Sequence, residues 1–239
     1  MMRIPIIVFF ISLLLLNCRK SEKKPDSWVL VFQDDFNGQE VDQANWSIYN
    51  SPGNAGYGLR RPEAFTVANG YLTITAGMNN GSLVSGGMAQ IINQIYGKYE
   101  FRVRTEPDSS EATSGVVLTW PQSERWPVDG ENDMYETGQE ASRSSFNTNI
   151  HYGTSPSTQY SFHHQVDATQ WHTVAMEWTS GSIKIYRDSI LVWTMNEKVA
   201  IPKVPHHLCI QLDAFKSEMT GTVHMDVDWV KIYRLDAND

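Results

Sequence analysis

Cysteine and positive charge are both scarce in this sequence. It has only two cysteines, Cys18 and Cys209, so at most one intramolecular disulfide could form. Its 19 lysines and arginines are outnumbered by 27 aspartates and glutamates, which gives a net charge of −8. A nucleic-acid-binding surface must be basic to neutralise phosphates. The composition therefore argues against a nucleic-acid partner and, less firmly, against a strongly anionic polysaccharide.

A long apolar run occurs at the N-terminus, over residues 4–16. It is short for a bilayer span but typical of a signal-peptide core. The sequence that follows, Leu15-Leu16-Asn17-Cys18, resembles a bacterial lipobox, in which the cysteine is lipidated and becomes the first residue. We therefore expect a lipoprotein signal peptide over residues 1–17 and a lipidated Cys18. A plain secretory signal or an uncleaved anchor is the alternative.

The lipobox has consequences for location and for the remaining cysteine. Residues 18–27 are polar and charged, which predicts a flexible tether before a single domain over residues 28–239. We expect an exported bacterial lipoprotein, anchored to the cell membrane or outer membrane only through its lipid, and a monomer. Cys209 would then be the only free thiol, buried as a small hydrophobic residue in the stretch HLCIQL.

A helical period is absent after the tether, and short alternating segments replace it. Segments rich in Val, Ile, Thr, Tyr and Trp are separated by Gly, Pro, Asn and Ser. They predict strands over residues 27–36, 71–77, 97–105, 114–120, 146–153, 171–179, 182–194, 208–215 and 222–234, with a hairpin turn at 187–189. Many short strands in one body predict an all-β fold, a β-sandwich or jelly roll of antiparallel sheets.

Three carboxylates are crowded into the stretch WPVDGENDMYETG: Glu131, Asp133 and Glu136. Side chains alternate between the faces of a strand, so Glu131 and Asp133 share one face. Glu136 lies at an odd offset from Glu131 and would face the other side. A β-bulge between Asp133 and Glu136 would return it to the shared face. The spacing therefore predicts a bulge and a single row of three acids.

Such a row suits glycoside hydrolysis. Two outer carboxylates at roughly 5–5.5 Å can serve as nucleophile and general acid/base of a retaining enzyme, and a third between them would tune their pKa values. Spacing alone does not decide which outer acid is the nucleophile. An acidic strand edge and a calcium loop remain alternatives, although the stretch ENDMYE lacks the sharp glycine turn of a calcium loop.

The stretch GENDMYE, with WP before it, resembles the active-site strand of glycoside hydrolase family 16 in its bulged Glu-x-Asp-x-x-Glu form. Further segments resemble the family in the same order, across nearly all of residues 28–235. They are VFQDDFNG, VDQANWSIY, ANGYLTITA, YGKYEFRVR, NIHYG, QWHTVAMEWTSGSIKIYRD and VDWVKIYR. One departure is Asn132, where the family has an aliphatic residue. A buried amide there needs a hydrogen-bond partner.

The resemblance implies a concanavalin-like jelly roll and an endo-acting, retaining glycosidase of the laminarinase or agarase type. The expected substrate is a β-1,3-glucan or a related β-glucan or galactan. By position, Glu131 resembles the nucleophile, Glu136 the acid/base and Asp133 the assisting acid. No cofactor is required by this chemistry. Many members bind calcium on the convex side; Asp35 and Asp228 match those positions, and a salt-bridge role for them is an equal alternative.

Other residues are candidates for binding the polysaccharide. Pyranose faces stack on aromatic rings, which makes Trp126 the first platform candidate and Trp120 the second, with core packing as the alternative. His151 in NIHYG and Gln211 in CIQLDAF resemble cleft positions of the family. Arg60 follows a glycine-rich loop, residues 51–61, that could border a cleft. We expect His163 and His164 in a solvated loop, and Trp178 and Trp193 in the core.

Two other functions share the same fold. A non-catalytic carbohydrate-binding protein would have no reason to keep three coupled acids, so the intact triplet favours an enzyme. A transglycosylase would use the same covalent intermediate with a sugar acceptor, and the sequence does not separate it from a hydrolase.

Overall fold

The computed structural model describes residues 27–236. The expected signal peptide, the expected lipidation site Cys18 and nearly all of the expected tether lie outside this range. The described chain forms 17 β-strands, two short 3₁₀ turns, η1 (Asn54–Gly56) and η2 (Pro62–Ala64), and no α-helix. Within this part of the chain no helix has the length and apolar character needed to cross a membrane. The all-β jelly-roll prediction is confirmed.

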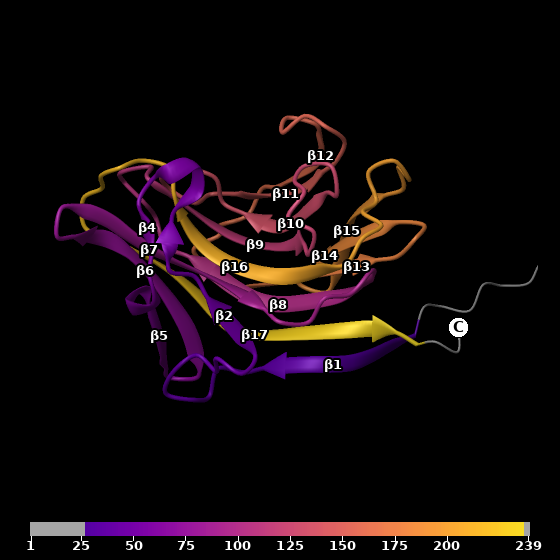
Figure 1. The fold of residues 1–239 in the computed structure, drawn as a ribbon, viewed down its shortest axis with the longest axis horizontal. Coiled ribbons are helices and arrows are strands. Elements are labelled where there is room, and N and C mark those ends of the chain that lie inside the picture. The colour runs from indigo at the N-terminus through magenta and orange to yellow at the C-terminus, as the bar shows by residue number, and fades with distance from the viewer. Residues whose placement is uncertain (1–26, 237–239) are drawn as a thin grey trace, which may run out of the picture.

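One sheet forms the concave side of the sandwich. Its neighbours are antiparallel, in the order β2 (Trp46–Ile48), β7 (Ser82–Gln90), β16 (His206–Ala214), β9 (Thr113–Pro121), β10 (Glu131–Glu136), β11 (Phe146–His151) and β12 (Gln159–His164). Figure 1 shows β16 curving across the molecule beneath β9, β10 and β11. The curvature turns one face of this sheet into the floor of a hollow.

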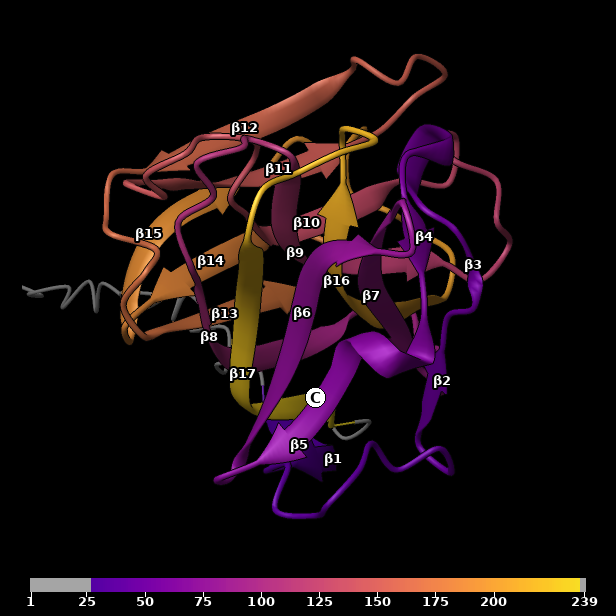
Figure 2. The same cartoon turned by 90° about the vertical axis from the view of Figure 1, so that its left-hand side faces the viewer.

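The second sheet packs behind the first. It is built around the long strand β17 (Thr222–Leu235), with β6 and β1 along one side and β8 along the other. Its strands are β1 (Trp28–Asp34), β3 (Ser51–Pro52), β4 (Leu59–Arg60), β5 (Phe65–Ala68), β6 (Tyr71–Asn79), β8 (Gly97–Thr105), β13 (His172–Trp178), β14 (Ile183–Arg187) and β15 (Ile190–Met195). Strand β7 pairs with both sheets and joins them, as Figure 2 shows.

Alternation explains which residues fill the core. Strand β8 alternates buried and half-buried positions along its whole length, as expected for a sheet with one face on the core. Strands β9 and β10 are buried at nearly every position, because their second face carries the walls of the hollow. Leu72, Ile74, Phe101 and Val103 of the outer sheet meet Val117, Ile210 and Leu212 of the concave sheet in one apolar core.

Several predictions about single residues can be checked here. Trp178 is fully buried and Trp193 packs against the core, as predicted. Cys209 is buried, and burial raises the pKa of its thiol to about 12. The loop prediction for His163 and His164 is wrong. Both lie on β12, and His164 is fully buried and stacked on Phe146, so burial lowers its pKa to about 3.

Candidate active site

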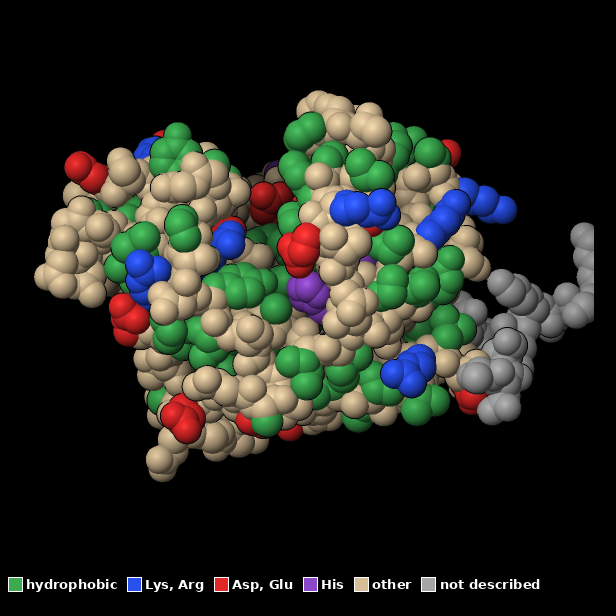
Figure 3. Space-filling model, in the orientation of Figure 1, with side chains coloured by type: hydrophobic (Ala, Val, Ile, Leu, Met, Phe, Trp, Pro, Cys, Tyr) green, Lys and Arg blue, Asp and Glu red, His purple; other side chains and the backbone are tan. Residues whose placement is uncertain are grey.

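The cleft on the concave face has a volume of ≈ 810 Å³. Figure 3 shows the surface hollowed between two raised parts, with acidic side chains inside the hollow and at its rim. Period-two alternation selects the side chains that reach the cleft. On β16 they are His207, Gln211 and Asp213, whereas Leu208, Ile210 and Leu212 face the core. Strands β9, β10 and β16 thus each supply a row of side chains to the cleft, while β7 and β11 supply Ala89 and His151.

The three acids of β10 all line this cleft. Glu131 and Asp133 are 9% and 4% exposed, and Glu136 is half-buried. The pairing register with β11 shifts between Asp133 and Glu136, where Met134 and Tyr135 together oppose Thr148. The register with β9 shifts at the same place. This irregularity lies where the odd offset predicted a bulge, and it returns Glu136 to the side of the other two acids.

The residues around the acids hold them in place. His151 Nε2 lies 3.1 Å from Asp133 Oδ2, across the β10–β11 pair. Asn149 on the same strand donates a hydrogen bond to Glu136 Oε2. The Asn149 amide oxygen in turn accepts hydrogen bonds from Ser161 and Gln159 of β12. Strands β11 and β12 therefore act as a support that fixes Asp133 and Glu136 from one side.

The close packing of carboxylates changes how they titrate. Burial, and then the charge of Asp133, raise the pKa of Glu131 well above its usual range. Burial, and then the charge of Glu136, do the same for Asp133. Neighbouring like charges disfavour each other, so the charge of Asp133 opposes ionisation of Glu131.

Oxygen and nitrogen atoms of Glu131, Asp133 and His151 lie within 4.8 Å of one another, so this trio could also hold a divalent cation. It is the only such group of three found among residues 27–236. Asp35 and Asp228 do not belong to it. Asp35 accepts a hydrogen bond from Gln33, and Asp228 forms an ion pair with Arg102. Asp228 thus has the salt-bridge role foreseen as one alternative, and calcium at this pair stays a prediction.

All five side chains predicted to bind substrate line the cleft: Trp120, Trp126, His151, Arg60 and Gln211. The two indoles are stacked, with ring centroids 6.3 Å apart and planes at 15°. Trp126 also lies 6.0 Å from the His151 ring. The glycine-rich loop borders the cleft as predicted, through Ser51, Gly53 and Asn54. The tryptophan pair therefore forms an aromatic wall next to the acids.

Buried polar atoms without a protein partner gather at this cleft. They include Ser114 Oγ, His151 Nδ1 and Gln211 Oε1, whereas Trp126 and Asp133 interact with the Glu131 carboxyl group. A buried polar atom without a hydrogen bond costs stability, so native structures keep few of them. These atoms belong to residues that line the cleft, and each has less than 1 Å² of its own surface exposed.

Asn132 is buried behind the acids, on the core side of β10. Its amide nitrogen donates to Thr119 Oγ1 at 2.8 Å, and Thr119 Oγ1 lies 3.2 Å from His206 Nδ1. His206 Nε2 lies 3.1 Å from the Asp129 carbonyl, and burial lowers the His206 pKa to about 4. The amide therefore finds a partner in a buried polar chain, although its oxygen has none.

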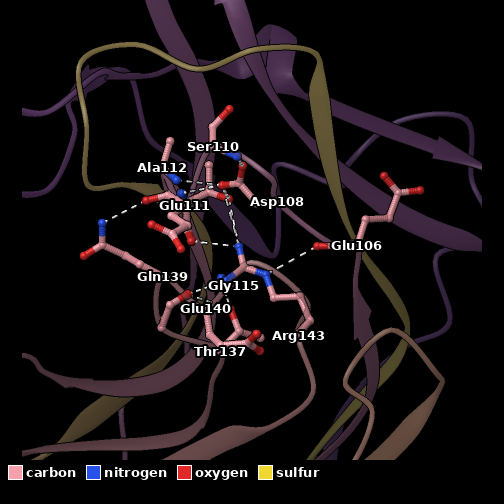
Figure 4. Close-up of polar contacts among 12 residues, drawn as sticks. Glu106, Asp108, Ser110, Glu111, Ala112, Gly115, Thr137, Gln139, Glu140 and Arg143 are labelled. Carbon is pink, nitrogen blue, oxygen red and sulfur yellow. Dashed lines mark hydrogen bonds and ion pairs between the residues drawn. The ribbon is translucent and has the colours of Figure 1, made fainter.

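Strand β10 ends in a second buried polar cluster, which sequence reasoning missed. Arg143 is fully buried and donates to the carbonyl oxygens of Gly138, Thr113 and Glu106 (Figure 4). Its guanidinium lies 3.9 Å from the buried carboxylate of Asp108. Because Gly138 is two residues after Glu136, this cluster fixes the chain directly beyond the third acid.

Other cleft residues were also missed. Tyr49, Asp213, Glu124 and His207 line the cleft, and Asp213 forms an ion pair with Arg60. Period two could have found Asp213, because it lies two residues after Gln211 on the same strand. Tyr49 follows a short edge strand and gave no signal.

Solved structures of similar fold include three laminarinases. The endo-1,3-β-glucanase catalytic domain from Thermotoga petrophila RKU-1 has a TM-score of 0.76 at 17% identity, covering 88% of this chain and 99% of that chain. The laminarinase from Rhodothermus marinus has 0.76 at 22%, covering 89% and 100%. The laminarinase from Flavobacterium sp. UMI-01 has 0.73 at 23%, covering 86% and 100%. These likenesses establish the fold.

Comparison with curated protein sequences finds no match. The family model described as glycosyl hydrolases family 16 matches residues 57–231, which is well over half of the chain and includes the three acids. The chain belongs to glycosyl hydrolases family 16 and is a glycosidase.

Proposed function

We propose that this protein is an endo-acting, retaining hydrolase of a β-linked glucan, with a β-1,3-glucan as the first candidate substrate. One observation carries the proposal: three carboxylates of a single strand line one cleft beside a stacked pair of tryptophans. The cleft volume is at the upper end of the ~300–1,000 Å³ typical of ligand sites, which suits several sugar units. The structurally similar proteins named above as laminarinases support the choice of substrate.

The proposed first step uses the two outer acids. A Glu131 carboxylate oxygen attacks the anomeric carbon while Glu136 gives its proton to the departing glycosidic oxygen. The products are a shortened glycan and a glycosyl ester on Glu131. In the second step Glu136 takes a proton from water, and the water oxygen displaces Glu131 from the anomeric carbon. Two inversions give net retention.

The protonation state of Asp133 affects how easily the buried nucleophile Glu131 ionises. Its own burial, together with the charge of Glu136, favours the protonated form. When Asp133 is protonated, its charge no longer opposes ionisation of Glu131, and a neutral asparagine at this position would act on the Glu131 pKa in the same direction. Of the two main causes that raise the Glu131 pKa, burial then remains alone. Glu131 can therefore carry the negative charge that the attack requires.

The first test is a screen of residues 27–239 against laminarin, lichenan, agarose, porphyran and carrageenan with product analysis. A hydrolase releases shorter glycans, a transglycosylase also lengthens some of them, and a carbohydrate-binding protein binds without releasing anything. Release of internal fragments from laminarin supports the proposal. Binding of laminarin without any cleavage would refute it.

The second test separates the two outer acids. Glu131→Ala should lower hydrolysis by several orders of magnitude, and azide should restore turnover with an inverted glycosyl azide, because the anion fills the vacated space. Glu136→Ala should still form the glycosyl-enzyme from substrates with a good leaving group, and azide should then give a retained product. An exchange of these two stereochemical outcomes would reverse the assignment.

A further inference from the structure

The charge of the cleft is one-sided. Among the residues between 27 and 236 that line it, Arg60 is the only arginine or lysine. Five lining residues carry carboxyl groups: Glu124, Glu131, Asp133, Glu136 and Asp213. The overall acidic composition is thus repeated at the cleft, and no local basic surface overrides it.

Arg60 is paired with a carboxylate of the same cleft. Its Nε and Nη2 atoms each donate a hydrogen bond of 2.8 Å to one oxygen of Asp213. Its guanidinium also lies 5.5 Å from the Tyr49 ring centroid. Burial disfavours its charge, but the hydrogen bonds and charge of Asp213 outweigh burial and raise the Arg60 pKa. Asp213 therefore neutralises the Arg60 charge and occupies the Nε–Nη2 edge of the guanidinium, while the Nη1 donors lie outside this pair.

The Tyr49 contact is built into the sheet. Gly87 on β7 leaves the space that the Tyr49 ring fills, since a Cβ atom at this glycine would lie 2.7 Å from Tyr49 Cδ2 and 3.3 Å from Gln211 Cγ. Tyr49 in turn lies under Arg60. Packing of Tyr49 against Gly87 therefore fixes the ring on which Arg60 of the ion pair lies.

The two histidines that line the cleft, His151 and His207, do not supply a free positive charge in place of Arg60. Burial lowers the His207 pKa below its usual value, so this ring is neutral at neutral pH, and its Nδ1 lies 3.1 Å from Asn93 Oδ1. His151 faces Asp133, so any positive charge on it is matched there. Ser114 and Gln211, which also line the cleft, are neutral.

We propose, building on the function proposed above, that the cleft selects uncharged glycans and rejects sulfated or uronic acid-containing ones. Asp213 is a specificity-determining residue in this proposal, because it occupies the one guanidinium that could pair with an anionic substituent. An anion in this cleft would lose its hydration and meet carboxylates without a free cation.

The test compares laminarin with chemically sulfated laminarin, which shares its backbone. Binding is followed by tryptophan fluorescence or calorimetry, and cleavage by release of reducing ends. Wild type should bind the sulfated polymer at least about tenfold more weakly. Asp213→Asn removes the charge that neutralises Arg60. It should reduce the ratio of the two affinities, laminarin over sulfated laminarin, by at least about fivefold.

Asp226→Asn is the matched control. Asp226 is also buried and also accepts hydrogen bonds from an arginine, Arg104, but it lies on β17 of the other sheet. Asp226→Asn changes the net charge by the same amount as Asp213→Asn. It should change the ratio of the laminarin and sulfated-laminarin affinities by less than about twofold. The double variant Arg60→Gln with Asp213→Asn should lose the gain of Asp213→Asn, because the freed guanidinium is then absent.

Each outcome decides between the alternatives. Equal or tighter binding of sulfated laminarin by wild type would overturn the selection of uncharged glycans, and this measurement needs no variant to fold. Equal effects of Asp213→Asn and Asp226→Asn would overturn the role of Asp213. If laminarin binds selectively but is never cleaved, the proposed hydrolase function fails while the specificity stands. If neither polymer binds, both proposals fall.

Discussion

At the scale of single residues, the charge of Asp133 affects the pKa of the proposed nucleophile, Glu131. Replacing it with asparagine keeps the shape of the side chain and removes its charge. If Glu131 must be ionised to attack, kcat/KM rises with pH through the Glu131 pKa. The Asp133 charge is the second cause, after burial, that raises this pKa. Asp133→Asn should therefore move the acidic limb of the pH profile to lower pH, while kcat falls by roughly ten- to a hundredfold.

The measurement is kcat/KM on laminarin oligosaccharides across the acidic range. Asp226→Asn is again the control, since it removes a buried carboxylate from the far sheet and should leave the limb in place. An acidic limb that stays fixed or moves to higher pH in Asp133→Asn would contradict the coupling between Asp133 and Glu131.

The sequence predicted the row of acids because local rules were enough. Alternation placed Glu131 and Asp133 on one face, and the odd offset of Glu136 required the irregularity that the β10–β11 register shows. The partner of Arg60 could not be predicted in this way. Asp213 lies 153 residues away, and only the folded topology brings β4 and β16 together. Pairings set by tertiary structure leave no periodic trace in the chain.

At the scale of elements, the two longest strands that prediction missed are β7 and β12. Strand β12 contains two histidines, a serine and a glutamine, which are typical of a loop. It forms because β11 pairs with it along its whole length and because Thr148 lies 2.9 Å from the buried His164. Strand β7 was missed because it contains Gly86 and Gly87, which weaken strand propensity. Close packing needs a glycine at 87, as the Tyr49 ring shows.

The end of β10 yields a prediction about stability. Burial alone would raise the Asp108 pKa, but hydrogen bonds from Thr113 and from the backbone outweigh it and lower the pKa, so Asp108 is ionised beside Arg143. Arg143→Met leaves the buried Asp108 charge without its counter-ion and three carbonyl groups without their donor. The free energy of unfolding should fall by about 3–5 kcal/mol, measured by urea denaturation.

Arg125→Met is the matched control for Arg143. The ion pair of Arg125 with Asp129 is at the surface, with the Arg125 side chain 68% exposed, and it should contribute less than about 1 kcal/mol. Similar losses in the two variants would show that the buried cluster does not anchor the strand. Arg143→Lys keeps the charge without the planar fork and should fall between wild type and Arg143→Met.

At the scale of the whole molecule, the prediction for Cys18 concerns where the enzyme acts. The lipobox predicts that the cysteine carries a lipid and that residues 18–27 tether the domain to the membrane. Cys18→Ser should release the protein from the membrane fraction or block removal of the signal peptide, as seen by fractionation and mass. If the variant matures and fractionates as wild type does, the lipoprotein prediction is wrong.

The stability of the whole domain should carry a signature of the buried acids. The Glu131 pKa is raised in the folded protein, so ionised Glu131 destabilises the fold relative to the unfolded chain, where the pKa is about 4.3. The stability associated with its protonated form is present below that value and is lost as pH rises through the folded pKa. Glu131→Gln has no carboxyl group to ionise, so this loss of stability with rising pH is absent in the variant.

Glu131→Gln should therefore be inactive yet more stable than wild type at pH 8. We expect the Tm to rise by at least about 2–4 °C, the shift that about 1 kcal/mol causes in a domain of this size. The gain should shrink to nothing near pH 4, where the carboxyl is protonated in both states. Glu124→Gln alters an exposed carboxyl at the same cleft and should leave Tm nearly unchanged at both pH values. A gain that is equal at pH 4 and pH 8 would come from packing. It would then refute the idea that the crowded acids cost this enzyme stability because their charges serve its chemistry.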